Sequence, residues 1–209
     1  MKTYEILPTD KNLVQTLIDD TIGRDSDVFR FVNILNSIDC SYSVALDGRW
    51  GSGKTFFVKQ AKLVLDANNE HLAVMDADVR KKVLTSCQKF IPANSELQPQ
   101  VCVYYDAWEN DNDEDPVLSL IYTILTGINS DYSFSEGKDV LSIAASIGEF
   151  FTGRNIAEIL KELRSASPLD SLKSKKELRE KVNEFFNSLL SEKGNRLIIM
   201  VDELDRCKP

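Results

Sequence analysis

The sequence contains very little histidine and few cysteines. His71 is the only histidine among 209 residues, and the four cysteines are widely separated with no Cys-x-x-Cys pair: Cys40, Cys87, Cys102 and Cys207. Structural zinc sites need clustered cysteine and histidine ligands, and disulfide scaffolds need a dense cysteine framework. The sequence therefore predicts neither a zinc site nor a disulfide framework, and it favours a cytoplasmic location.

A long apolar run and an excess of basic residues are also missing. Residues 1–5 begin no apolar stretch typical of a signal peptide, and the longest uncharged run, residues 116–130, includes Pro, Gly, Asn, Ser and Thr. A membrane-spanning helix needs about 20 mostly apolar residues. Lys and Arg number 25 against 33 Asp and Glu, a net charge of −8. We therefore expect a soluble protein without a membrane span and without the basic surface that binds nucleic acid nonspecifically.

The composition that remains is typical of a globular α/β protein. Hydrophobic residues make up 43% of the chain and charged residues 28%, which argues against disorder. At about 150 residues per domain, the length suits one domain, or one domain with an insertion.

Apolar spacing predicts alternating helices and strands. Spacings of three and four predict helices over residues 26–38, from about 53 to 65, from Asp115-Pro116 onwards, over 156–163 and over 178–190. Alternating or continuous apolar residues predict strands over 41–47, 100–106 and 197–201, the last buried on both faces of a parallel sheet. Residues 130–153 are the least informative, with a candidate helix over 140–151.

The strongest motif lies between a predicted strand and a predicted helix and matches G-x-x-x-x-G-K-[ST] in full. Its residues are Gly48, Arg49, Trp50, Gly51, Ser52, Gly53, Lys54 and Thr55. Glycines allow backbone N–H groups to surround phosphate oxygens, and the helix N-terminus favours negative charge. Lys54 is expected to neutralise the β- and γ-phosphates and Thr55 to ligate Mg²⁺. The motif predicts a nucleotide-binding phosphate loop.

A second motif ends the run from Leu197 to Val201 with Asp202 and Glu203. A buried strand that delivers an acid at its carboxyl end is what a Walker B motif requires. We expect Asp202 to hold Mg²⁺, and Glu203 to orient or deprotonate the attacking water. Glu203 and Lys54 are thus the candidate catalytic residues.

Two further features favour less specific interpretations. The acidic residues from Asp111 to Asp115 lack the glycine and the final acid of a calcium-binding loop, so we interpret them as a solvated turn before a helix. Trp108 and Trp50 are interpreted as packing residues rather than ligand contacts, although the position of Trp50 inside the loop leaves nucleotide contact open.

Three segments together resemble the KAP family of P-loop NTPases. They are the phosphate loop with its internal Trp-Gly, Asp106-Ala107-Trp108-Glu109, and Val201-Asp202-Glu203-Leu204-Asp205-Arg206-Cys207, in the family's order. The resemblance covers about residues 25–209. Asp106 stands where the family usually has Asn, and Glu203 where it often has Asp. Many members carry transmembrane helices between the Walker motifs, whereas residues 140–151 here are interrupted by Glu149.

The resemblance implies an α/β fold of the additional-strand (ASCE) type, a parallel sheet flanked by helices with a helical insertion between Walker A and Walker B. It implies ATP and Mg²⁺ as cofactors and a role in bacterial phage defence. It also implies a second polar pair, Asp205 and Arg206, beside the site. A structural salt bridge is the alternative for that pair.

The positions of the motifs divide the chain into four segments. These are a helical lead-in over 1–40, the first part of the NTPase core over 41–129, a helical insertion with the following helix over 130–193, and the Walker B strand over 194–209. In the 5-1-4-3-2 strand order of such NTPases, the fourth strand follows Walker B, but the sequence ends seven residues after Asp202. We therefore expect the N-terminal part of a longer protein, with an incomplete sheet and weak hydrolysis.

Two functions remain open at this point. The chain is either an ATP-hydrolysing module or an interaction module that binds ATP with little turnover and signals through a protein partner or self-association. Base specificity is not encoded in any recognisable segment.

Overall fold

The computed structural model describes residues 6–73, 75–90, 96–111, 119–120, 123–124, 127–128, 180, 183, 186–187 and 189–207. The helices predicted over 140–151 and 156–163 lie outside these residues, as does the predicted helix start at Asp115-Pro116. The four predicted segment boundaries stay predictions.

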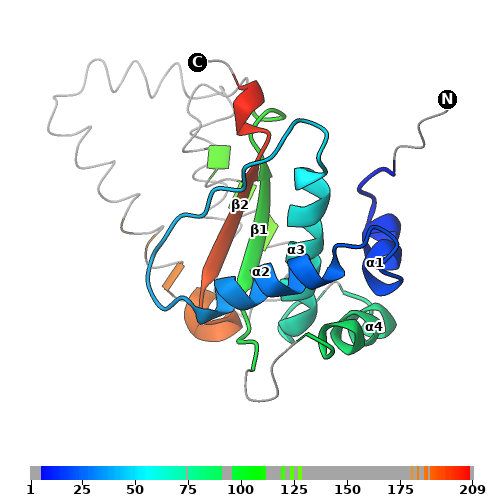
Figure 1. Ribbon diagram of the computed structural model, residues 1–209. Coiled ribbons are helices and arrows are strands. Elements are labelled where there is room, and N and C mark those ends of the chain that lie inside the picture. Colours follow the sequence, from blue (N-terminus) through cyan, green and yellow to red (C-terminus); the bar gives the residue numbers. More distant parts are fainter. Residues whose placement is uncertain are drawn as a thin grey trace, which may run out of the picture.

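Within the part of the chain that the structure describes, four helices precede the first of two strands (Figure 1). In chain order they are α1 (Asp10–Ile18), α2 (Asp25–Ser37), α3 (Lys54–Asn68), α4 (Ala77–Cys87), β1 (Val101–Asp106) and β2 (Leu197–Asp202), followed by a 3-10 turn, η1 (Leu204–Arg206). The described residues between 180 and 193 are helical, in agreement with the helix predicted over 178–190.

Side-chain caps fix the starts of two helices that the apolar spacing left unassigned. The Thr9 hydroxyl accepts a hydrogen bond from the Asn12 amide before α1, and the Asp76 carboxylate accepts from the Asp78 and Val79 amides before α4. Such caps satisfy N–H groups that have no partner inside the helix. Each helix then turns an apolar stripe inward, which includes Leu13 and Leu17 in α1.

The two strands form a parallel pair in which Val101 lies beside Leu197 and Asp106 beside Asp202. β1 is almost entirely buried, but β2 exposes one face, where the side chains of Ile199 and Val201 are 40% and 46% exposed. The prediction that this strand is buried on both faces is therefore wrong. Its apolar run has two faces, and only the one that contains Met200 packs into the core.

Helix α3 lies at the centre of the packing. It contacts α1, α2, α4 and β1, and Figure 1 shows it beside β1 with α1 and α4 further from the sheet. One continuous hydrophobic core includes Val28 of α2, Val64 of α3, Val83 of α4 and Cys102 of β1. This packing fixes the N-terminus of α3 at the end of the molecule where the strands finish.

Asn69 joins the C-terminus of α3 to both strands. Its fully buried side-chain amide donates to the carbonyl of Gln100 at 2.9 Å and to that of Lys193 at 2.8 Å, and its oxygen accepts from the His71 amide. These carbonyls precede β1 and β2, so a single side chain sets where both strands begin relative to the helix.

The strand predicted over residues 41–47 is absent. The structure assigns no strand there, and Val44 and Leu46 are 48% and 39% exposed. A strand is stable only when a neighbour pairs with its backbone. Among the described residues the sheet consists of β1 and β2 alone, so this segment reaches the phosphate loop without ladder hydrogen bonds.

Candidate functional site

Backbone conformation shapes the phosphate loop. Gly51 and Gly53 have φ values of 73° and 84°, a left-handed region that residues with a Cβ rarely adopt. Gly48 donates its amide to the Asp47 carboxylate at 2.8 Å, and the Ser52 amide donates to the Arg49 carbonyl at 3.1 Å. The loop is thus closed by its own hydrogen bonds before α3 begins.

Lys54 opens α3 directly after the loop. Its Nζ donates to the Gly48 carbonyl at 3.0 Å, so the ammonium group lies back across the loop. The first-turn N–H groups of a helix have no partner within that helix, and together with the helix dipole they attract anions. The ammonium and the helix N-terminus therefore supply positive charge at one place.

Arg24 supports the loop from a helix that the motif does not include. It is the residue before α2, and its Nη1 donates to the Ser52 carbonyl at 3.0 Å. Sequence reasoning missed this residue, because a single arginine ahead of a helix has no distinctive pattern.

Asp202 ends β2 in a fixed orientation. One carboxylate oxygen accepts from the Tyr104 hydroxyl at 2.9 Å and the other from the Glu203 amide at 2.9 Å. The adjacent strand is held in place by the Ala107 amide, which donates to the Asp202 carbonyl at 3.0 Å. Two single hydrogen bonds leave lone pairs on both carboxylate oxygens.

Tyr104 is a second residue that sequence reasoning missed. Partial burial raises the pKa of its hydroxyl, and the hydrogen bond to Asp202 and the negative charges of that carboxylate and its neighbours raise this pKa further. The hydroxyl consequently stays protonated at physiological pH and remains a hydrogen-bond donor to Asp202. The Lys59 ammonium lies 4.6 Å from the centre of the Tyr104 ring. The alternation of residues in β1 gives no signal that distinguishes this tyrosine from Tyr105.

Arg206 contacts three side chains at the carboxyl end of the two strands. Its Nε lies 2.5 Å from Oε2 of Glu203, and its guanidinium carbon lies 5.8 Å from the centre of the Trp50 ring and 5.2 Å from that of Trp108. Trp50 is 80% exposed and Trp108 54% exposed, so the interpretation of both as packing residues is wrong. Their exposed rings flank a cation instead. Arg206 forms its salt bridge with Glu203, so the alternative prediction of a salt bridge between Asp205 and Arg206 is wrong.

One cavity of about 690 Å³ brings the two motifs together. The predicted site residues that line it are Trp50, Gly51, Ser52, Gly53, Lys54, Thr55, Asp202 and Glu203. Arg24, Asp205 and Arg206 also contribute to its wall. Gly48 and Arg49 are absent from the lining, but their carbonyls accept the hydrogen bonds of Lys54 and Ser52 described above. Figure 1 shows the light-blue loop segment near the red η1 at this end.

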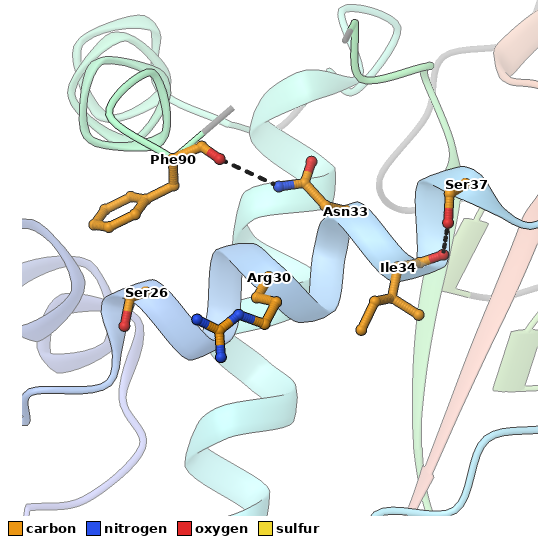
Figure 2. Close-up of a pocket in the computed structure, with 6 residues that line it drawn as sticks. All are labelled: Ser26, Arg30, Asn33, Ile34, Ser37 and Phe90. Atoms are coloured by element: carbon orange, nitrogen blue, oxygen red, sulfur yellow. Dashed lines mark hydrogen bonds between the residues drawn. The ribbon is translucent and has the colours of Figure 1, made fainter. Parts of the chain in front are cut away.

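A second hollow, of about 410 Å³, lies along α2 beside Phe90 and has a different character (Figure 2). Figure 2 shows the Asn33 amide directed to the Phe90 carbonyl and the Ser37 hydroxyl to the Ile34 carbonyl. The exposed Arg30 lies 3.7 Å from Asp27. These polar groups bond to neighbouring backbone and side chains rather than converging on one point, so the cavity of the phosphate loop is the stronger candidate site.

The oxygen ligands and positive charges of that cavity suit a nucleoside triphosphate bound with a hard cation. The Thr55 hydroxyl and the Asp202 carboxylate are oxygen ligands of the kind that Mg²⁺ takes, usually together with waters and phosphate oxygens. Lys54 and the start of α3 provide the complementary positive charge for phosphates. Groups that could hold a cation and groups that could hold an anion therefore line one cavity.

Comparison with known proteins identifies one family. Residues 28–209 match the model of the KAP family P-loop domain, which is most of the chain. No curated protein and no solved structure matches the chain. Within the described ranges, no helix has the length and apolar character needed to cross a membrane.

Proposed function

Because the chain belongs to the KAP family of P-loop domains, we propose that its cavity binds ATP with Mg²⁺ and hydrolyses the terminal phosphate. The observation that carries this proposal is the shared cavity of about 690 Å³, in which Lys54 and Thr55 of the phosphate loop meet Asp202 and Glu203 from the end of β2. The fold is a parallel pair of strands with helices, and the finer ASCE assignment with its helical insertion is part of the proposal, as is a setting in bacterial phage defence.

Each residue has a role that follows from its chemistry. Lys54 and the N-terminus of α3 hold the phosphates, and Thr55 with Asp202 would hold Mg²⁺, which neutralises phosphate charge when bound. Glu203 orients a water and accepts its proton as the oxygen bonds to the γ-phosphorus. The bond from that phosphorus to the β–γ bridging oxygen breaks, and ADP leaves with the electron pair.

Binding without appreciable turnover is the second candidate. Two observations favour it: the Lys54 ammonium donates to the loop carbonyl of Gly48, and the Glu203 carboxylate is paired with Arg206. Residues 41–47 also reach the loop outside the sheet, so no ladder fixes the distance between the loop and Asp202. We therefore expect slow but measurable turnover if the chain is an enzyme, and negligible turnover if it is an interaction module.

The first experiment measures thermal unfolding with and without Mg-ATP for the chain and its Lys54→Ala variant. At 100 times Kd, ligand binding adds about 2.7 kcal/mol, or roughly 5–10 °C in Tm for a domain of this size. We expect this increase in the parent chain and its loss in Lys54→Ala. Lys81→Ala, which removes an exposed lysine from α4, is the matched control and should keep the increase. An equal increase in both variants would refute the proposed site.

The second experiment separates hydrolysis from binding. Phosphate release is measured for the parent chain and for Glu203→Gln, in which the side chain loses its ability to accept a proton. Release that falls at least about tenfold, with ATP retained on the variant, supports the enzyme. Equal and negligible release from both, with binding intact, supports the interaction module instead.

A further inference from the structure

We propose that Arg206 senses the terminal phosphate of the nucleotide and thereby controls whether Glu203 is available as a base. The Arg206 guanidinium pairs with Glu203, the Nε atom lying 2.5 Å from Oε2. Both side chains line the cavity that contains Lys54. This role rests on the proposed function, since it assumes that ATP occupies that cavity.

The geometry keeps Arg206 close to the place where phosphates would lie. Trp50 belongs to the phosphate loop and Trp108 follows β1, and both rings lie within 6 Å of the guanidinium carbon. An aromatic face within about 6 Å attracts a guanidinium, and this attraction does not use the N–H donors of the guanidinium. The two tryptophans thus retain the cation between the loop and the end of the sheet while its hydrogen bonds remain exchangeable.

The salt bridge between Arg206 and Glu203 can be replaced by a bond from Arg206 to another anion, because solvent reaches both side chains. The Arg206 side chain is 35% exposed and that of Glu203 23%, so solvent weakens their attraction. A guanidinium has five N–H donors and binds phosphate oxygens in a two-pronged manner. A γ-phosphate, which carries more negative charge than one carboxylate, is therefore expected to take Arg206 from Glu203.

The backbone from Glu203 to Arg206 holds these two residues next to each other. Glu203 has a φ of 56°, an unfavourable conformation for a residue with a side chain, and the Arg206 amide donates to the Glu203 carbonyl at 3.1 Å. The 3-10 turn η1 fixes the two residues three positions apart on one short turn. Release of the carboxylate consequently requires only the Arg206 side chain to move, and the main chain stays in place.

Arg206 is accordingly a positioning residue that distinguishes a triphosphate from a diphosphate. The chain contains two tryptophans, and both flank Arg206, so tryptophan fluorescence, excited selectively over tyrosine, reports on this cluster. Mg-AMP-PNP, a non-hydrolysable triphosphate, should change the tryptophan emission of the parent chain more than Mg-ADP does.

The test compares the affinities of Mg-AMP-PNP and Mg-ADP, each measured by calorimetry, for the parent chain, Arg206→Gln and Arg206→Lys. We expect Arg206→Gln to weaken triphosphate binding at least fivefold and to change diphosphate binding less than twofold. Arg206→Lys keeps the positive charge but cannot form two parallel hydrogen bonds to a phosphate, so it should recover part of the triphosphate affinity. Arg30→Gln, which removes an exposed arginine from α2, should change neither affinity.

The outcomes separate this role from the function on which it rests. If Arg206→Gln weakens both nucleotides equally, or neither, Arg206 is only a structural clamp and the inference is wrong while nucleotide binding stands. If the parent chain binds neither nucleotide, the proposed function fails and takes this inference with it. A fluorescence change that is the same for both nucleotides would likewise overturn the sensing role.

Discussion

Asp202 depends on a neighbouring tyrosine for its orientation. The Tyr104 hydroxyl donates to it at 2.9 Å, and the raised pKa of that hydroxyl keeps the donor protonated. We predict that Tyr104→Phe raises the Mg²⁺ concentration needed for nucleotide binding at least about tenfold, because a hydrogen bond to a charged group contributes about 1.5–3 kcal/mol. Titration of Mg²⁺ against a fluorescent ATP analogue measures this.

A matched control exists for that prediction. Tyr42→Phe also removes a hydroxyl, but its partner is the Leu35 carbonyl, away from the cavity. It should leave the Mg²⁺ titration unchanged. Tighter Mg²⁺ binding in Tyr104→Phe would contradict the prediction and show that the tyrosine competes with the metal.

At the residue scale, the sequence predicted the site where a local motif carries the chemistry. The residues from Trp50 to Thr55 line the cavity together with Asp202 and Glu203 at the end of β2, as the two motifs together suggested. The positions of Arg24 and Tyr104 depend on how separate elements pack, and no spacing along the chain encodes that. The same reason explains why two exposed tryptophans were mistaken for packing residues.

At the scale of elements, the sequence predicted those that carry their own signal. The helix expected over 26–38 spans Asp25–Ser37, and the strand expected over 100–106 spans Val101–Asp106. The helix Ala77–Cys87 was missed although Val79, Val83 and Cys87 recur every four residues after the Asp76 cap. The prediction of a strand over 41–47 was wrong for another reason. Apolar residues in a segment do not show whether a neighbouring strand is present to pair with its backbone.

The turn into β2 offers an element-scale prediction. A Cβ added at Gly194 would lie 2.9 Å from the Pro99 carbonyl oxygen, and that oxygen already accepts from the Asn195 amide at 2.8 Å. The clash is therefore with backbone that cannot move freely. We predict that Gly194→Ala lowers the free energy of unfolding by about 1–3 kcal/mol, measured by urea denaturation.

Gly127 provides the comparison for that substitution. It is helical, and among the described residues the one atom that its added Cβ would meet is Val103 Cγ1 at 3.8 Å, an ordinary contact. Alanine there should be neutral or stabilise by up to about 1 kcal/mol, because glycine is a poor helix former. If the two alanine variants were equally stable, the close approach at Gly194 would not restrict the fold.

At the scale of the whole molecule, one core joins elements that are distant in the sequence. Leu17 of α1, Val32 of α2, Leu65 of α3, Cys87 of α4 and Met200 of β2 belong to the same cluster. If any one of these elements detaches, the core residues of its neighbours become exposed to water, so the elements should unfold together. Sequence periodicity identified apolar faces, but their shared core follows from the three-dimensional contacts of α3.

Two buried thiols make this shared core measurable. Burial raises the pKa of Cys87 to about 12 and also raises that of Cys102, whereas Cys40 is exposed. The thiolate is the reactive form, so neither buried thiol should react with a disulfide reagent at pH 8 until the core unfolds. We predict rapid labelling of Cys40 and labelling of the buried pair only at the rate of global unfolding, followed by mass spectrometry of the peptides.

The same thiols predict how stability depends on pH. Unfolding returns them to an ordinary pKa near 9, and since the folded pKa values are higher, the folded state holds more protons above pH 9. Their contribution is complete below pH 9 and decreases as the pH rises, with a limiting slope of about 1.4 kcal/mol per pH unit for each thiol. Urea denaturation from pH 8 to pH 10 should show this decrease. The Cys87→Ala, Cys102→Ala double variant should show a shallower one, relative to its own value at pH 8. Equal slopes for the two proteins would mean that these thiols do not carry the pH dependence.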